Sequence, residues 1–136
     1  MKAFCTAPAL ACLASMALLS AASAHATCPA PPADAAVMAE GPVQAIWQAE
    51  PSPITVGRPF ALWVTLCPAD AVLRRVDATR PEHRHGMNYR PSLKSLGEGR
   101  WRVEGLLWHM SGRWELTLDL QVQSQDHRLR QSVSLP

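Results

Sequence analysis

The chain has 136 residues, of which 12 are Pro and 7 are Gly, with 48% hydrophobic and 18% charged residues. This length fits one domain and leaves little room for two. Thirteen Lys and Arg against eleven Asp and Glu give a net charge of +2. The composition therefore favours neither a nucleic-acid-binding protein nor a polyacidic one.

The first residues have the three-part layout of a secretory signal peptide. Met1-Lys2 is a short positive start, residues 7–19 are an apolar run, and Ala24-His25-Ala26 is a cleavage motif. A membrane anchor is the alternative, but the apolar run is shorter than the ~20 residues that a spanning helix needs. The sequence predicts a signal peptide at 1–26 and an exported, periplasmic domain at 27–136.

A second cleavage site fits the same segment. Cleavage after Ala24 would leave His25 at the N-terminus, where the free amine and the imidazole could together chelate a metal ion. Cleavage after Ala26 is preferred because Ala then occupies both key positions.

Cysteine usage agrees with export. The mature domain keeps only Cys28 and Cys67, since Cys5 and Cys12 leave with the signal peptide. In an oxidising compartment such a pair predicts one disulfide. The bridge would close a loop of about 40 residues and stabilise the fold by about 4 kcal/mol in the chain-entropy model. Two thiolate metal ligands are the alternative.

Apolar residues of the mature chain alternate with a period of two. The Ala- and Pro-rich segment 28–41 is expected to run over the surface as a leader. Seven short alternating runs follow, at residues 43–47, 60–66, 72–78, 92–96, 101–107, 114–122 and 127–135. This pattern predicts an all-β, Ig-like β-sandwich of about seven antiparallel strands.

Two short segments concentrate the side chains that could bind a metal. Residues 82–91 read EHRHGMNYRP, and residues 107–114 read LWHMSGRW. They hold three of the four His and two of the three Met of the mature domain. Thioether sulfur favours Cu(I) and imidazole accepts either oxidation state of copper, whereas zinc more often recruits Cys or carboxylate.

The spacing of these residues supports a shared site in part. In extended backbone His83, His85 and Met87 project from one face, unless Gly86 bends the chain. The two predicted strands between Met87 and His109, residues 92–96 and 101–107, would cross the sandwich and return. The two segments can therefore meet at one end of the sandwich.

Simpler interpretations stand beside each candidate. His83 can be a solvated loop residue, and His109 can cap a turn. Met110 can fill space between Trp108 and Trp114 as an ordinary core residue.

Enzymatic functions are not favoured. The chain has no G-x-S-x-G motif, no phosphate-binding glycine loop, and no free Cys once the disulfide forms. Its middle section is basic, with Arg at positions 74, 75, 80, 84, 90, 100 and 102. Alternating solvent-facing strand positions explain these arginines most simply, and docking to an acidic partner is the alternative.

The order of the motifs resembles the YtkA-like family of bacterial domains, also described as FixH-like. The resemblance rests on residues 85–91 (HGMNYRP), 97–102 (GEGRWR) and 109–116 (HMSGRWEL), and covers roughly residues 55–123. Family hallmarks are a His-x-Met-like segment before a proline, a Gly-x-Gly-aromatic turn and a Met-x-Gly-x-Trp segment. Ser111 stands where the family often has Pro.

The resemblance implies an exported β-sandwich linked to copper handling and respiratory oxidase assembly. Position by position, His85, Met87 and Met110 match the family's candidate ligands, with His109 as a neighbour. The arrangement is also similar in kind to periplasmic copper chaperones on a cupredoxin-like sandwich. Unlike FixH itself, the mature chain is expected to keep no membrane helix.

Together these features predict a periplasmic copper chaperone or scavenger that holds Cu(I). The candidate ligands are His85, Met87, Met110, His109 and His83. Trp108 and Trp114 would form an apolar wall that limits water access, and copper would pass by ligand exchange to a periplasmic or membrane acceptor protein. The alternative is a metal-free interaction module that uses the same loop end, and a small-molecule binder is a third option.

Overall fold

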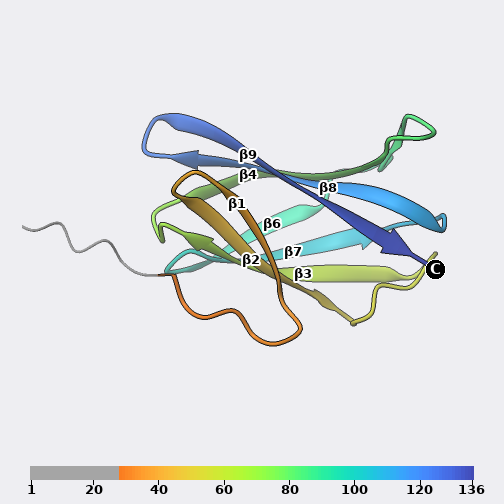
Figure 1. Cartoon of the computed structure of the whole chain (residues 1–136), viewed down its shortest axis with the longest axis horizontal. Helices are drawn as coiled ribbons and strands as arrows, with labels where there is room; N and C mark the ends of the chain where they lie inside the picture. The colour runs from red at the N-terminus through yellow and green to blue at the C-terminus, as the bar shows by residue number, and fades with distance from the viewer. Residues whose placement is uncertain (1–27) are drawn as a thin grey trace, which may run out of the picture.

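A computed structural model describes residues 28–136, and the predicted signal peptide lies outside the described residues. The described chain is all-β and forms two antiparallel sheets that pack face to face (Figure 1). Its strands are β1 (Ala36–Glu40), β2 (Val43–Glu50), β3 (Pro59–Cys67), β4 (Val72–Arg80), β5 (His85–Gly86), β6 (Ser92–Gly97), β7 (Arg100–Leu107), β8 (Gly112–Val122) and β9 (Gln125–Leu135).

The larger sheet has the strand order β1-β2-β3-β7-β6, and the smaller one β5-β4-β8-β9. The predicted all-β sandwich is confirmed, with nine strands in place of about seven. Within residues 28–136, no helix is long and apolar enough to cross a membrane.

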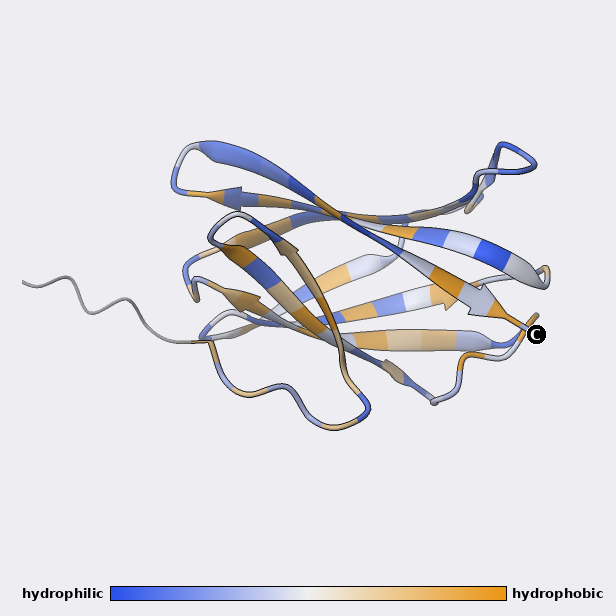
Figure 2. Ribbon diagram, in the orientation of Figure 1, coloured by the Kyte–Doolittle hydropathy of each residue, from blue (hydrophilic) through white to orange (hydrophobic). Residues whose placement is uncertain are grey.

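Side-chain alternation along the strands builds the core. In β8, Trp114, Leu116 and Leu118 are completely buried, while Glu115 and Thr117 between them are half-buried and face outward. Figure 2 shows the same alternation of apolar and polar residues along several strands. Two sheets with such inner faces can bury a shared core, which is why a period of two predicted the sandwich.

The two additional strands lie where the sequence signal is weakest. Residues 36–40 were expected to belong to the surface leader, and this expectation is wrong. They form β1, which pairs with β2 through a tight hairpin and buries Met38 at 3% exposure. β5 has only two residues, too few for any periodicity to show.

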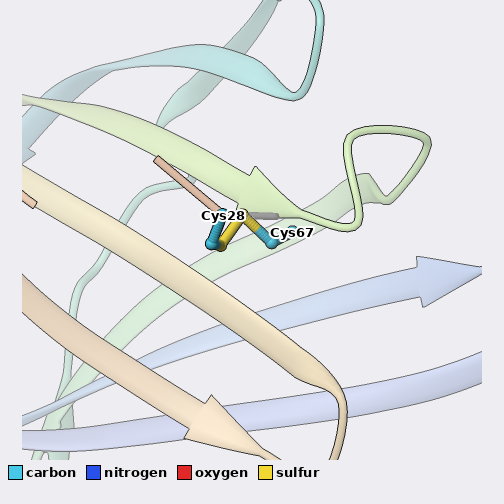
Figure 3. Close-up of a disulfide and its surroundings, with 2 residues drawn as sticks. All are labelled: Cys28 and Cys67. Carbon is cyan, nitrogen blue, oxygen red and sulfur yellow. A yellow bond between two sulfur atoms is a disulfide. The ribbon is translucent and has the colours of Figure 1, made fainter. Parts of the chain in front are cut away.

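The remaining leader, residues 28–35, is tied to the outer face of the larger sheet at two points. Cys28 and Cys67 form a disulfide with a Cα–Cα distance of 5.7 Å across 39 positions of sequence (Figure 3). Farther along, the Gln48 side-chain amide donates a 2.6 Å hydrogen bond to the Asp34 carboxylate. The outward-facing Ile46 in this region is only 6% exposed. The leader therefore acts as a strap over the sheet.

We expect the double substitution Cys28→Ser with Cys67→Ser to lower the free energy of unfolding by about 3–4 kcal/mol, because the unfolded chain gains loop entropy. Urea denaturation measures this difference. Reducing agent should give the same loss in the wild type and none in the double variant; equal stability of both proteins without reductant would contradict the prediction.

An ion pair on the outer face of the smaller sheet shifts a carboxyl pKa. Arg128 donates to both carboxylate oxygens of Asp119, at 2.6 Å and 3.1 Å. These hydrogen bonds hold the pKa of Asp119 below its ordinary value of 3.8. Because the folded-state pKa is lowered, the pair stabilises the fold above the ordinary pKa, and this contribution disappears as pH falls through the lowered value.

Arg128→Gln should therefore raise the pKa of Asp119 and lower stability at neutral pH, with the difference from wild type vanishing in acid. Carboxyl-carbon NMR titration follows the pKa, and urea denaturation across the acid range follows stability. Arg100→Gln, which removes an equally exposed arginine elsewhere, should leave the Asp119 titration unchanged. A pH-independent loss in Arg128→Gln would refute the linkage.

Candidate functional site

The structure brings the two His- and Met-bearing segments to one end of the sandwich. The chain leaves β4 at Arg80 and enters β8 at Gly112, and these strands are hydrogen-bonded neighbours. The Glu82 carboxylate lies 3.5 Å from the Arg113 guanidinium, joining the two segments directly. The β2–β3 loop reaches the same end, because the Gly57 amide donates to the Trp108 carbonyl at 2.8 Å.

We call this the His/Met end and define it as residues 51–58, 80–87 and 108–113. In Figure 1 the chain between β4 and β5 projects beyond the sandwich at this end, where the C-terminus also lies.

His85 lies on the inner-face side of β4. It stands opposite Arg80 in the β4–β5 register, and directly opposed residues of antiparallel strands project from the same face. His83 lies instead in the preceding turn, where its amide donates to the Arg80 carbonyl at 3.2 Å. The extended geometry that would align His83 with His85 and Met87 is therefore not present. Both imidazoles are exposed.

The two methionines are half-buried and pack against the core. The Met87 amide donates to the Ala78 carbonyl at 3.1 Å. This bond holds Met87 beside β4, on the side away from β8. Met110 approaches from the β8 side, where its sulfur contacts Arg80 at the end of β4. His109 is exposed, and its ring centroid lies 5.8 Å from that of Trp114.

A buried guanidinium lies beside the Met110 sulfur. Arg80 is only 9% exposed, and its Nη1 donates to the Met110 sulfur at 3.5 Å. Its Nη2 lies 3.6 Å from the Glu82 carboxylate, and its buried Nε has no partner among residues 28–136. Arg80 is therefore buried beside one candidate ligand, and its acceptors are a thioether and a carboxylate 3.6 Å away.

Sequence analysis missed this role, since Arg80 was grouped with solvent-facing arginines. A signal was present. Arg80 has the same strand parity as Val76 and Ala78, both of which are buried. Alternation alone would have placed the Arg80 side chain on the inner face.

Gly112 makes room for the guanidinium. A Cβ at this position would lie 2.8 Å from Nη2 of Arg80, and the backbone φ of +102° is one that side-chain-bearing residues rarely adopt. Gly112 has the same strand parity as Trp114, so a side chain at position 112 would point into the interior. The backbone conformation therefore favours glycine here, and a side chain at this position would displace the Arg80 guanidinium.

An aromatic cluster lies beneath the His/Met end. The rings of Trp108 and Trp114 stack at 5.3 Å and 6°, and Phe60 meets Trp108 edge-on at 5.2 Å. Trp114 Nε1 donates to the Met110 carbonyl at 2.9 Å. Because both tryptophans are completely buried, they form a packed floor under Met110 and hold its backbone in place.

Tyr89 anchors the segment after β5. Its hydroxyl donates to the Leu107 carbonyl at 2.7 Å, linking this segment to β7. Partial burial raises the pKa of the Tyr89 phenol above its ordinary value of 10.0. A cavity of about 190 Å³ adjoins it, lined by Arg75, Val76, Asp77, Met87, Asn88, Tyr89 and Arg90.

Within residues 28–136, no three His, Cys, Asp or Glu side chains gather so that they could hold a metal ion. In comparisons with protein-family models, curated proteins and solved structures, nothing matches this chain. The resemblance to the YtkA-like family stays a prediction.

Gly112→Ala should displace Arg80 and destabilise the fold by about 2 kcal/mol through combined clash and backbone strain. Gly105→Ala is the matched control, because Gly105 has a φ of +83° and a Cβ added there would meet nothing within 4 Å. We expect the control to lose only about 1 kcal/mol from strain. Urea denaturation compares the two, and the ε-methyl NMR signal of Met110 should shift in Gly112→Ala alone. Equal losses with an unmoved signal would contradict the packing argument.

Proposed function

We propose that this protein binds copper as Cu(I) at the His/Met end in the periplasm and passes it to an acceptor protein. The observation that supports the proposal is the convergence of two separate segments, one with His85 and Met87 and the other with His109 and Met110, on the end of β4. Imidazole nitrogen and thioether sulfur are the donor set that suits this ion.

The burial of the donors fits a Cu(I) site that must exchange its ligand set. Both methionines are half-buried over the aromatic floor, while the imidazoles of His85 and His109 are exposed. Half-buried sulfur limits access of water, and exposed imidazoles can be reached by an incoming protein. Copper would then move by stepwise replacement of ligands, with no redox step.

Arg80 would oppose binding. Its guanidinium uses the Met110 sulfur as an acceptor, and its positive charge lies where a copper ion would come close. Coordination through Met110 therefore requires Arg80 to turn away, for example toward Glu82. Such competition weakens metal affinity, which suits transfer better than storage.

A metal-free interaction module is the second candidate function. The specific observation in its favour is the same Arg80–Met110 hydrogen bond, because it occupies the sulfur without any metal. Tyr89, at 40% exposure, and the exposed imidazoles would then be contact residues of a recognition surface.

A Cu(I) competition titration against a chromophoric chelator tests the copper proposal. We expect one copper per chain with a Kd below about 1 μM, weakened about tenfold or more in each of His85→Ala, Met87→Leu and Met110→Leu. Leucine keeps the packing volume of methionine, so these changes remove sulfur with little cost to the fold.

Two matched controls come from the same chain. Met38→Leu removes a core sulfur from β1, and His127→Ala removes an imidazole from β9; neither should change copper affinity. Tryptophan fluorescence gives a second readout, because Trp114, one of the five tryptophans, has its ring near His109. No binding, or binding unchanged in all three site variants, would overturn the proposal.

A further inference from the structure

The His/Met end carries a positive charge that the balanced composition of the whole chain conceals. Its three segments contain four arginines and one glutamate, together with three histidines. The arginines are Arg58, Arg80, Arg84 and Arg113. They come from all three segments, so folding gathers charges that are dispersed in the sequence.

These arginines are poorly neutralised. Glu82 is shared between Arg80 at 3.6 Å and Arg113 at 3.5 Å, both longer than the 2.7–2.9 Å of a charge-assisted hydrogen bond. Arg58 and Arg84 make no ion pair with any residue of 28–136. By contrast, Arg128 on the smaller sheet donates two hydrogen bonds to Asp119, at 2.6 Å and 3.1 Å.

Arg80 differs from the others because it is buried and incompletely bonded. A guanidinium has five N–H donors in a planar fork that matches a carboxylate. Here Nε has no partner among the described residues, and Nη1 is bonded to a thioether, which is a weak acceptor. A carboxylate brought to this end would be the better acceptor and would displace the sulfur.

We infer that the His/Met end is a docking surface for an acidic segment of a partner protein, one carboxylate of which takes Arg80 away from the Met110 sulfur. The docking step is supported by the charges and contacts of the copper-free protein. Its consequence, a Met110 sulfur freed for metal exchange in the docked complex, rests on the proposed copper function.

A protein segment fits this surface better than an anionic membrane does. Recognition of anionic lipids uses contiguous clusters of Lys and Arg, whereas these arginines come from the β2–β3 loop, the end of β4, the β4–β5 loop and the start of β8. The half-buried methionines and the exposed Tyr89 add apolar contact, and Met, Tyr and Arg are enriched in protein interfaces.

Fluorescence anisotropy with copper-free protein tests the docking step. The probe is a labelled peptide of alternating Glu and Gly, and alternating Gln and Gly is the control peptide. We expect saturable binding of the acidic peptide that weakens as salt rises to about 0.15 M, where the Debye length is about 8 Å. The double variant Arg84→Gln with Arg113→Gln should bind about tenfold more weakly.

The matched control is Arg74→Gln with Arg100→Gln, which removes the same charge away from the His/Met end. It should change affinity by less than about twofold. Equal losses in both double variants would show unspecific attraction and overturn the assigned surface. Absence of peptide binding together with sedimentation on anionic phospholipid vesicles would assign the surface to membranes instead.

The exchange at Arg80 has its own readout. In protein with ¹³C-methyl-labelled methionine, the acidic peptide should shift the ε-methyl signal of Met110 and leave that of Met38 in place. Binding without a shift at Met110 would overturn the exchange. Because no metal is present in any of these measurements, their outcome is independent of the Cu(I) titration, and either proposal can fail alone.

Discussion

The antiparallel pairing of β4 with β8 is the constraint on which the His/Met end depends. Its register places Val76 opposite Leu118 and Thr79 opposite Glu115, so the end of β4 and the beginning of β8 share one end of the sandwich. A slip of one residue would turn the buried leucines outward, and the core therefore fixes the register. As a result, Arg80 and Gly112 meet, although they lie far apart in the sequence.

The buried guanidinium of Arg80 then determines what this end can do. Removing a charge from water costs several kcal/mol unless the protein supplies good partners, yet the partners here are a thioether and a shared, distant carboxylate. The guanidinium uses the space that the missing side chain of Gly112 leaves open. Its Nη1 meets one of the candidate metal ligands, the Met110 sulfur.

Sequence reasoning reached the architecture because buried side chains follow a period of two, and β8 is the clearest case. Two strands were not predicted. β5 has only two residues, too few to show alternation, and β1 lies in a segment whose Ala and Pro residues obscure it. The convergence of the His- and Met-bearing segments followed from strand counting. The inward orientation of Arg80 was not predicted, because arginine is usually a surface residue. Only its position in the alternation of β4 shows that its side chain faces inward.

The Met110 thioether and a partner's carboxylate would compete for the Arg80 guanidinium as hydrogen-bond acceptors. The relative strengths of the two hydrogen bonds determine which acceptor is preferred. A bond from arginine to a carboxylate contributes about 1.5–3 kcal/mol, and a bond to a neutral acceptor about 1 kcal/mol. Exchanging the Met110 sulfur for a partner's carboxylate is therefore favourable by about 0.5–2 kcal/mol, a shift of about twofold to thirtyfold in the population of free sulfur. The isolated protein would keep its thioether occupied, and the docked protein would expose it. Binding of an acidic partner and availability of a soft metal ligand would thus be coupled through one side chain.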